Sequence, residues 1–232
     1  SLIIGSVATI LITLKDIPNT TFVMDVSVFR STARVLQGSL PFLVNNLTEL
    51  LTYGGFIWIS SFVLPGFLIS KLSVLHTFLF ITIYQVYDVF LRSKQADLVM
   101  DEKINYFLKL NRFIILATPL CVLFGGIILL RVIAPNFHFE ILELLFFSIF
   151  MIVELCYLVI KSVIQVDFKY SRSLFFYSIV RLSAIVIAFI TYFLFWQVNS
   201  LKDFLFLLSL FSLVGLLISN YYLKYKTNFS LW

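Results

Sequence analysis

Most Lys and Arg residues lie in every second connection between long apolar stretches, and this alternation limits the chain to a small set of folds. The apolar stretches cover 1–14, 38–60, 68–91, 113–134, 141–160, 173–196 and 203–223. Thirteen of the 17 cationic residues follow alternate stretches: Lys15, Arg30, Arg34, Arg92, Lys94, Lys103, Lys109, Arg112, Lys161, Lys169, Arg172, Lys224 and Lys226. The opposite connections hold only Lys71, Arg131 and Lys202. By the positive-inside rule, the richer side is cytoplasmic, so the sequence predicts an oriented, multi-pass membrane protein.

Composition and span length support helices that cross a bilayer. Hydrophobic residues make up 61% of the chain, charged residues only 12%, and the mean hydropathy is +1.03. Each full stretch exceeds about 18 residues, which at about 1.5 Å per residue covers about 30 Å of hydrocarbon. The stretches are continuously apolar and do not alternate, which favours helices over barrel strands. We therefore expect an all-α, polytopic transmembrane helix bundle of about six complete helices plus one partial helix.

Several function classes find no support in the sequence. The net charge of +5 gathers at one predicted membrane face, which topology and anionic lipid explain without a nucleic-acid partner. Cys121 and Cys156 both fall inside spans, so neither a disulfide framework nor a metal site is indicated. The chain contains no Gly-rich phosphate loop, which disfavours ATP-driven transport. We expect no enzyme, and we assign no catalytic residue, metal or cofactor.

The apolar pattern divides the chain into four parts. Residues 1–14 are too short for a span and begin without a basic segment, so we expect them to be the end of a preceding transmembrane helix. Residues 15–37 have apolar residues at helical spacing, which predicts a cytoplasmic amphipathic linker, with an ordinary solvated linker as the alternative. Residues 38–223 form the predicted six-helix lobe, and 224–232 a cytoplasmic tail.

The first complete span carries the densest group of polar residues. Asn45, Asn46 and Glu49 lie within about one helical turn and are expected on one face. A carboxylate about halfway across a membrane is costly, so it should face protein or water. Gly54-Gly55 follows one turn later, and we expect the helix to bend there. These three polar side chains are candidates for the lining of a substrate pathway, or for an amide network that packs helices together.

The second complete span adds Gln85 and Asp88 to the candidate pathway residues. Asp88 lies near the predicted cytoplasmic end of that span. A carboxylate in that position can also simply reach water, and this alternative is the favoured one for Asp88.

Glu154 and Arg181 are opposite charges at similar depth on sequential antiparallel helices. They lie about 10 and 12 Å from the predicted cytoplasmic ends at about 1.5 Å per residue. Each charge alone costs on the order of 2.5 to 3.5 kcal/mol at the bilayer centre, so we expect the two side chains to touch. The pair is either purely structural or part of a cavity that meets an anionic head group or a coupling ion.

The order of motifs resembles the second half of bacterial polysaccharide flippases of the multidrug/oligosaccharidyl-lipid/polysaccharide exporter superfamily. The segments that carry the resemblance are Gly38-Ser39-Leu40-Pro41-Phe42-Leu43-Val44-Asn45-Asn46-Leu47, Asp101-Glu102-Lys103 and Ile133-Ala134-Pro135-Asn136-Phe137. The resemblance covers nearly the whole chain but rests on order and spacing. It implies one lobe of a twelve-helix transporter in the bacterial cytoplasmic (inner) membrane, which flips lipid-linked oligosaccharide or polysaccharide repeat units by alternating access.

Such a transporter would bind an undecaprenyl-diphosphate type of lipid-linked sugar as its substrate and would be surrounded by membrane lipid. The sequence leaves open whether a coupling ion takes part. Two alternatives remain. A multidrug/cation antiporter of the same superfamily would bind cations at acidic residues such as Glu49 and Glu154. A membrane-embedded polysaccharide polymerase usually has a large external loop, whereas the external connections predicted for this chain are short.

Overall fold

The computed structural model describes residues 39–100, 112, 116–133, 135–166, 171–195 and 200–227. The predicted helix end at 1–14 and the linker at 15–37 lie outside the described residues. The chain forms two units by the contacts within each, Ser1–Gly38 and Ser39–Trp232, and all of the described residues belong to the second unit. Within them almost every residue is helical and none forms a β-strand, so the all-α prediction is confirmed.

The described helical elements follow one another along the chain in this order. After a helix over residues 39–49 come η1 (Leu50–Gly54), α3 (Phe56–Ser60), α4 (Gly66–Val74), η2 (Leu75–Ile81), α5 (Thr82–Met100), η3 (Cys121–Gly125), α7 (Gly126–Ile133), α8 (Ile141–Val166), α9 (Ser171–Phe195) and α10 (Leu201–Thr227). The three elements marked η are π-helical. The last helix continues into the predicted tail, as far as Thr227.

Four stretches of helix are long and apolar enough to cross a membrane: Gly66–Ser93, Ile141–Ser162, Ser173–Phe195 and Leu201–Tyr225. They coincide with four of the six complete spans that we predicted. Of the other two, 38–60 is interrupted within its length, and 113–134 is only partly described. The described residues therefore support a membrane-spanning helical protein, while the full number of spans remains a prediction.

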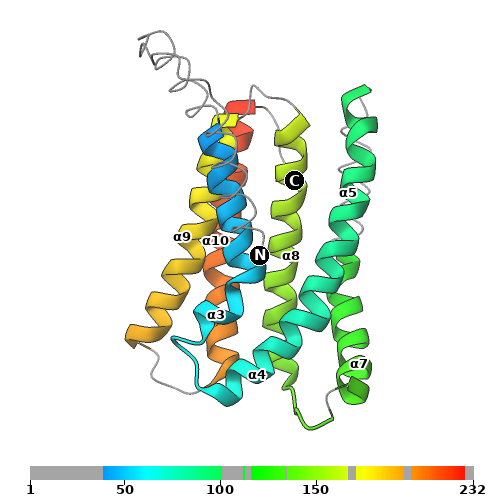
Figure 1. Cartoon of the computed structure of the whole chain (residues 1–232), viewed down its shortest axis with the longest axis vertical. Helices are drawn as coiled ribbons and strands as arrows, with labels where there is room; N and C mark the ends of the chain where they lie inside the picture. Colours follow the sequence, from blue (N-terminus) through cyan, green and yellow to red (C-terminus); the bar gives the residue numbers. More distant parts are fainter. Residues whose placement is uncertain are drawn as a thin grey trace, which may run out of the picture. The chain divides into compact units, whose positions relative to one another are not determined.

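The helices alternate in direction, as the charge pattern requires. Helix 39–49 and α9 begin at the end of the bundle where α5, α8 and α10 finish, whereas α3, α4 and the start of α8 lie at the opposite end (Figure 1). Lys161 and Lys224 belong to the first end, and Lys71 and Lys202 to the second. The described cations thus separate between the two ends in the way that the sequence indicates.

The first predicted span breaks at the position where a bend was expected. The backbone changes from α to π geometry over Leu50–Gly54, where the amide of Gly55 donates to the carbonyl of Leu50 at 2.8 Å. An α-helix resumes only at Phe56. A π turn carries one extra residue, and such turns occur often at functional sites. The pair of glycines lowers the cost of leaving the α-helical ladder.

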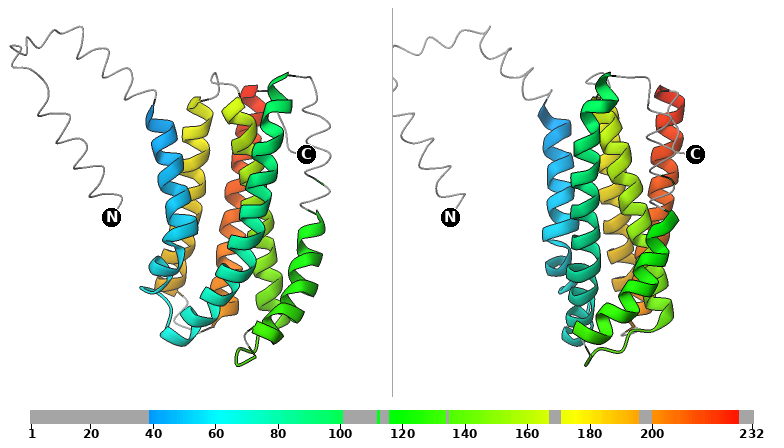
Figure 2. Two further views of the ribbon diagram at one scale, coloured as in Figure 1. Left: turned by 45° about the vertical axis from the view of Figure 1, so that its right-hand side comes forward. Right: turned by 90° about the vertical axis from the view of Figure 1, so that its right-hand side faces the viewer.

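α10 holds the bundle together because it packs along both α8 and α9, which have far less contact with each other. α8 is the most buried of the membrane-length helices. Gly215 permits the close approach: a Cβ at this position would lie 2.9 Å from Tyr157 Oη and 3.1 Å from Ala184 Cβ. Tyr157 is fully buried, so it has no free direction in which to move. Figure 2 shows the same three helices from two sides.

We predict that Gly215→Ala destabilises the bundle, because the added methyl group meets both neighbouring helices. Overpacking of this kind costs about 1 to 3 kcal/mol. Gly66→Ala, at the start of α4, is the matched control, since a Cβ at Gly66 meets nothing within 4 Å. Thermal unfolding of the purified protein in detergent measures the difference. Equal midpoints for the two variants would contradict the proposed close contact at Gly215.

Candidate functional site: a polar cluster inside the helix bundle

The predicted contact between Glu154 and Arg181 is present. Oε2 of Glu154 on α8 accepts a hydrogen bond from Nη2 of Arg181 on α9, and their side chains are only 1% and 3% exposed. Nη2 of Arg181 also donates to Tyr53 Oη at 2.5 Å. The guanidinium carbon lies 5.3 Å from the ring centre of Tyr53 and 5.5 Å from that of Tyr157. Two rings and a carboxylate therefore compensate one buried cation.

A second ion pair joins the first helix to α8. The sequence predicted a site role for one of its residues, Glu49, but not for the other, Lys161. Nζ of Lys161 is 2.5 Å from Oε1 of Glu49, with side chains 11% and 19% exposed. Lys161 was assigned to a cytoplasmic connection because it follows the last strongly apolar residues of its span. The spacing could have predicted its position, because Glu154 and Lys161 are seven residues apart and so share one face of α8.

Asn45 joins the second pair to α9. Its Nδ2 donates to Oε1 of Glu49 at 3.1 Å, and its Oδ1 accepts a hydrogen bond from Ser178 Oγ at 3.3 Å. Asn45, Glu49 and Tyr53 follow one another at intervals of four residues, so they form a single stripe along the first helix. This stripe contacts α8 through Lys161 and α9 through Ser178 and Arg181.

These contacts form two networks on the same three helical segments, one of Asn45, Glu49, Lys161 and Ser178 and one of Tyr53, Glu154 and Arg181, and we call the two together the polar cluster. The formal charges of the cluster cancel, since two carboxylates face two cations. Among the described residues, Oε1 of Glu154 and Nε of Arg181 are buried without a hydrogen-bond partner. The cluster therefore retains an unused acceptor and an unused donor, each of which would gain from a further polar partner.

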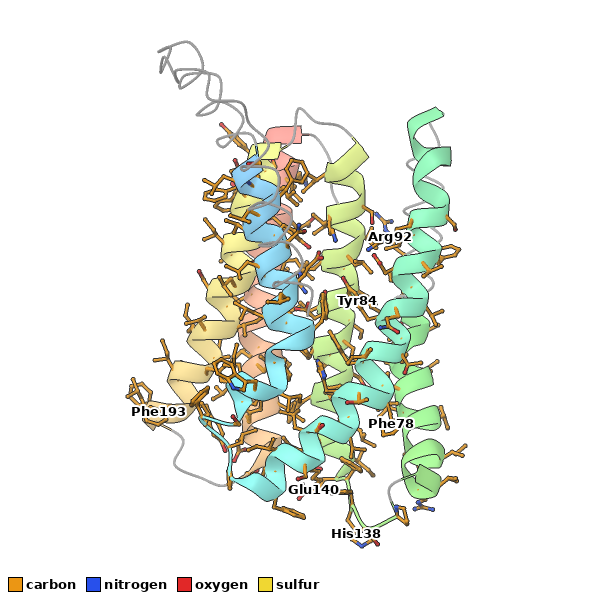
Figure 3. The ribbon with its side chains drawn as sticks, viewed as in Figure 1. Phe78, Tyr84, Arg92, His138, Glu140 and Phe193 are labelled. Atoms are coloured by element: carbon orange, nitrogen blue, oxygen red, sulfur yellow. The ribbon has the colours of Figure 1, made fainter. Side chains whose placement is uncertain are left out.

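The remaining predicted site residues lie outside the polar cluster. Asn46 is exposed, so the expectation that it shares a face with Asn45 and Glu49 is wrong: consecutive helical residues point about 100° apart. Gln85 is also exposed. Asp88 is half-buried and pairs with Arg92, one turn later on α5, at 2.7 Å. The side chain of Arg92, labelled in Figure 3, is 67% exposed and that of Asp88 is 19% exposed, so contact of Asp88 with water stays a prediction.

The opposite end of the bundle contains a separate charged contact. Nζ of Lys71 on α4 lies 2.6 Å from Oε2 of Glu143 on α8, and both side chains are buried. The same carboxylate oxygen accepts a hydrogen bond from the amide of Glu140 at 2.9 Å. Lys71 also lies 5.2 Å from the ring centre of Phe139. This pair attaches the start of α8 to α4, and neither residue was predicted to belong to a site.

Aromatic rings fill the space between the two charged regions. Phe56 stacks on His76 at 5.2 Å, His76 on Phe80 at 5.0 Å, and Phe80 on Tyr84 at 5.8 Å between ring centres. Nε2 of His76 lies 3.4 Å from the carbonyl oxygen of Thr52, so the stack also contacts the π turn η1. Within the described part of the chain, these rings separate the polar cluster from the end that holds Lys71 and Glu143.

Comparison of the chain with protein-family models, with curated proteins and with solved structures gives no match. Among the described residues, no group of three or more His, Cys, Asp or Glu side chains could hold a metal ion. By its own geometry, the polar cluster offers hydrogen bonds and balanced charge to a partner within apolar surroundings.

We predict that Arg181→Met destabilises the protein strongly, because it leaves Glu154 as an unpaired buried charge. Breaking one side of such a pair costs about 3 to 5 kcal/mol. The double variant Glu154→Leu/Arg181→Met should recover much of this loss, since no charge is left buried. Thermal unfolding in detergent measures both.

Asp88→Ala is the control for this series, because the partly solvated Asp88–Arg92 pair should contribute about 0 to 1 kcal/mol. A double variant as unstable as Arg181→Met would show that the two charges do not compensate each other.

Proposed function

We propose that the chain is a membrane lobe of a transporter that flips lipid-linked oligosaccharide or polysaccharide repeat units across the bacterial cytoplasmic membrane by alternating access. The proposed lobe has six complete spans and one partial span within a twelve-helix protein. The observation that carries the proposal is the polar cluster: three helical segments bring two hydrogen-bonded networks, each with its own ion pair, into a largely apolar bundle.

The exposure of the ion pairs favours access from the predicted cytoplasmic end. The Glu154–Arg181 side chains are 1% and 3% exposed, whereas those of Glu49 and Lys161 are 19% and 11% exposed. Lys161 is also the cation of the cluster that lies nearer the end of α8. We infer that Lys161 and Glu49 meet the phosphate and sugar groups of the substrate first, since a sugar needs donors and acceptors and a diphosphate needs cations.

The alternatives would use other groups. A cation antiporter would have to exchange the cation partner of Glu49 or Glu154 for its substrate, just as the proposed phosphate has to exchange the carboxylate partner of Lys161. A polymerase would be expected to have a large external loop. The connections at the predicted external end are short, at 61–65, 134–140 and 196–200. The proposed activity forms no covalent bond and requires no cofactor.

The transport proposal predicts that Asn45→Leu and Asn46→Leu have opposite outcomes. Asn45 lies in the polar cluster, whereas its neighbour Asn46 is exposed on the apolar outer face. In the full-length protein, Asn45→Leu should abolish most export and Asn46→Leu should leave it unchanged. Surface polysaccharide, measured together with the amount of folded protein in the membrane, decides between them.

A charge swap separates a transport role from helix packing. Glu49→Lys/Lys161→Glu preserves the ion pair but exchanges the positions of the two charges. If the pair acts only as a contact between helices, the swapped protein exports normally. Our proposal expects export to fall below that of the unchanged protein while the protein level stays normal, because the phosphate then meets a carboxylate in place of Lys161.

The proposed orientation is tested by labelling single cysteines in intact cells. Lys224 and Arg131 are both exposed and lie at opposite ends of the bundle. An impermeant thiol reagent should modify Arg131→Cys from outside and should modify Lys224→Cys only after the membrane is opened. The unmodified chain controls for the native cysteines, and the reverse pattern would invert the topology.

A further inference from the structure

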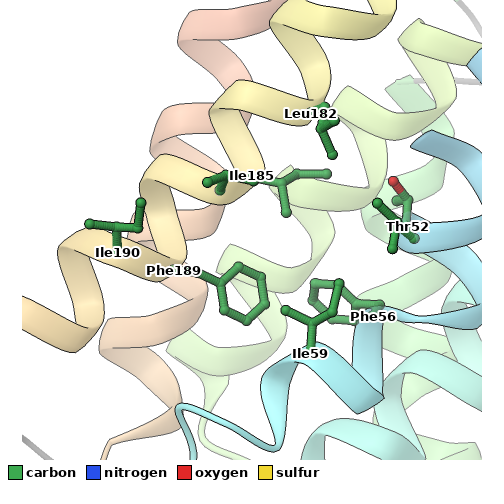
Figure 4. Close-up of a pocket in the computed structure, with 9 residues that line it drawn as sticks. Thr52, Phe56, Ile59, Leu182, Ile185, Phe189 and Ile190 are labelled. Carbon is green, nitrogen blue, oxygen red and sulfur yellow. The ribbon is translucent and has the colours of Figure 1, made fainter. Parts of the chain in front are cut away.

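A crevice of about 160 Å³ lies between the first interrupted helix and α9 (Figure 4). Thr52 of η1 and Phe56 and Ile59 of α3 line one side, while Ile185 and Phe189 of α9 line the other. Figure 2 shows helix 39–49 and α9 side by side. The Asn45–Ser178 and Tyr53–Arg181 contacts join the two segments, and the crevice extends beyond these polar contacts toward α3.

The lining of the crevice is entirely apolar in character. Its one hydroxyl group, on Thr52, donates to the carbonyl of Thr48 at 2.7 Å and so has its hydrogen bond within the helix. The other lining side chains are aliphatic or aromatic. Water inside would find no polar partner. An apolar cavity of about 150 Å³ in another protein stays dry and binds benzene, so this crevice has the size for a short segment of hydrocarbon.

The crevice opens sideways onto a surface that a bilayer would cover. Phe56, Ile185 and Phe189 form its buried floor, whereas Val186 at the rim is 44% exposed. Around the rim, the surface continues through exposed aliphatic side chains, such as Leu50 of η1 and Ile187 of α9. α9 has the length and composition of a membrane-spanning helix, and we expect its exposed apolar surface to face lipid tails.

We propose that the crevice binds one acyl chain of a membrane phospholipid, which acts as a wedge between η1–α3 and α9. Phospholipid chains are the most concentrated hydrocarbon beside this face, so mass action favours them as occupants. The bound chain would contact the π turn at Leu51 and Thr52, and η1 also carries Tyr53, which contacts Arg181. This inference concerns a lipid site and does not depend on the proposed transport function.

The test uses the full chain in vesicles that contain a phosphatidylcholine with a photoreactive diazirine in the middle of one acyl chain. After illumination, tandem mass spectrometry assigns the labelled residues. We expect label on the buried floor, at Phe56, Ile185 or Phe189, in addition to the exposed Leu50 and Ile187. Label confined to exposed residues would overturn the proposal, because the chain would then only pass over the crevice.

Two neighbouring substitutions provide the matched control. Val186→Phe places a ring in the mouth of the crevice and should remove the floor label, whereas Ile187→Phe, on a similarly exposed position that does not line the crevice, should preserve it. Ile190→Phe at the rim is a second filling variant if Val186→Phe does not fold. Floor label that persists in a folded filling variant would contradict the assignment.

A second probe tests the identity of the occupant. A polyprenyl phosphate with the same diazirine group is added in parallel at equal concentration. Floor label from the acyl probe supports a phospholipid site. Floor label from the prenyl probe alone would overturn our choice of occupant and assign the crevice to an isoprenoid lipid.

Discussion

A charge within hydrocarbon must find a partner inside the protein, and the arrangement of the bundle depends on this constraint. Arg181 and Glu154 come from two helices with less contact between them than either has with α10, and their ion pair adds to the contact of Tyr157 with Tyr177 that also joins these helices. Tyr53 then ties the first helix to the same guanidinium. An unpaired charge in hydrocarbon is costly. Arrangements that keep these groups in contact are therefore strongly favoured once the helices are in the membrane.

The described charged contacts divide the bundle into two chemically different ends. At one end, Lys71 and Glu143 are enclosed and linked to the first turn of α8. Toward the other end, the Glu49–Lys161 pair is partly accessible, and its carboxylate shares a hydrogen bond with Asn45. A stack of aromatic rings lies between them. A pathway through this lobe would therefore have a polar half and a half that is closed by rings.

The sequence predicts the parts of this structure that follow from periodicity and depth. The Glu154–Arg181 contact follows from opposite charge at similar depth, and the break at Gly55 follows from two weak helix formers in succession. Lys161 was missed because a span boundary read from hydropathy is uncertain by several residues, enough to move a cation from a helix interior to a connection. The exposure of Asn46 depends on helix rotation, which packing determines. The Lys71–Glu143 contact joins segments distant in the chain, and periodicity carries no information about it.

The π turn at Leu50–Gly54 makes the two parts of the first helix depend on the exact number of residues between them. An α-helix advances by about 100° per residue, so the extra residue of a π turn rotates everything after it by about that angle. Asn45 and Glu49 precede the turn and face the polar cluster, whereas Phe56 follows it and faces the aromatic stack. If the same residues wound as a regular α-helix, Asn45 and Glu49 would keep their places, but Phe56 would point about 100° away from its stack. In this segment, the winding of the backbone therefore decides where a side chain points as much as its position in the sequence does.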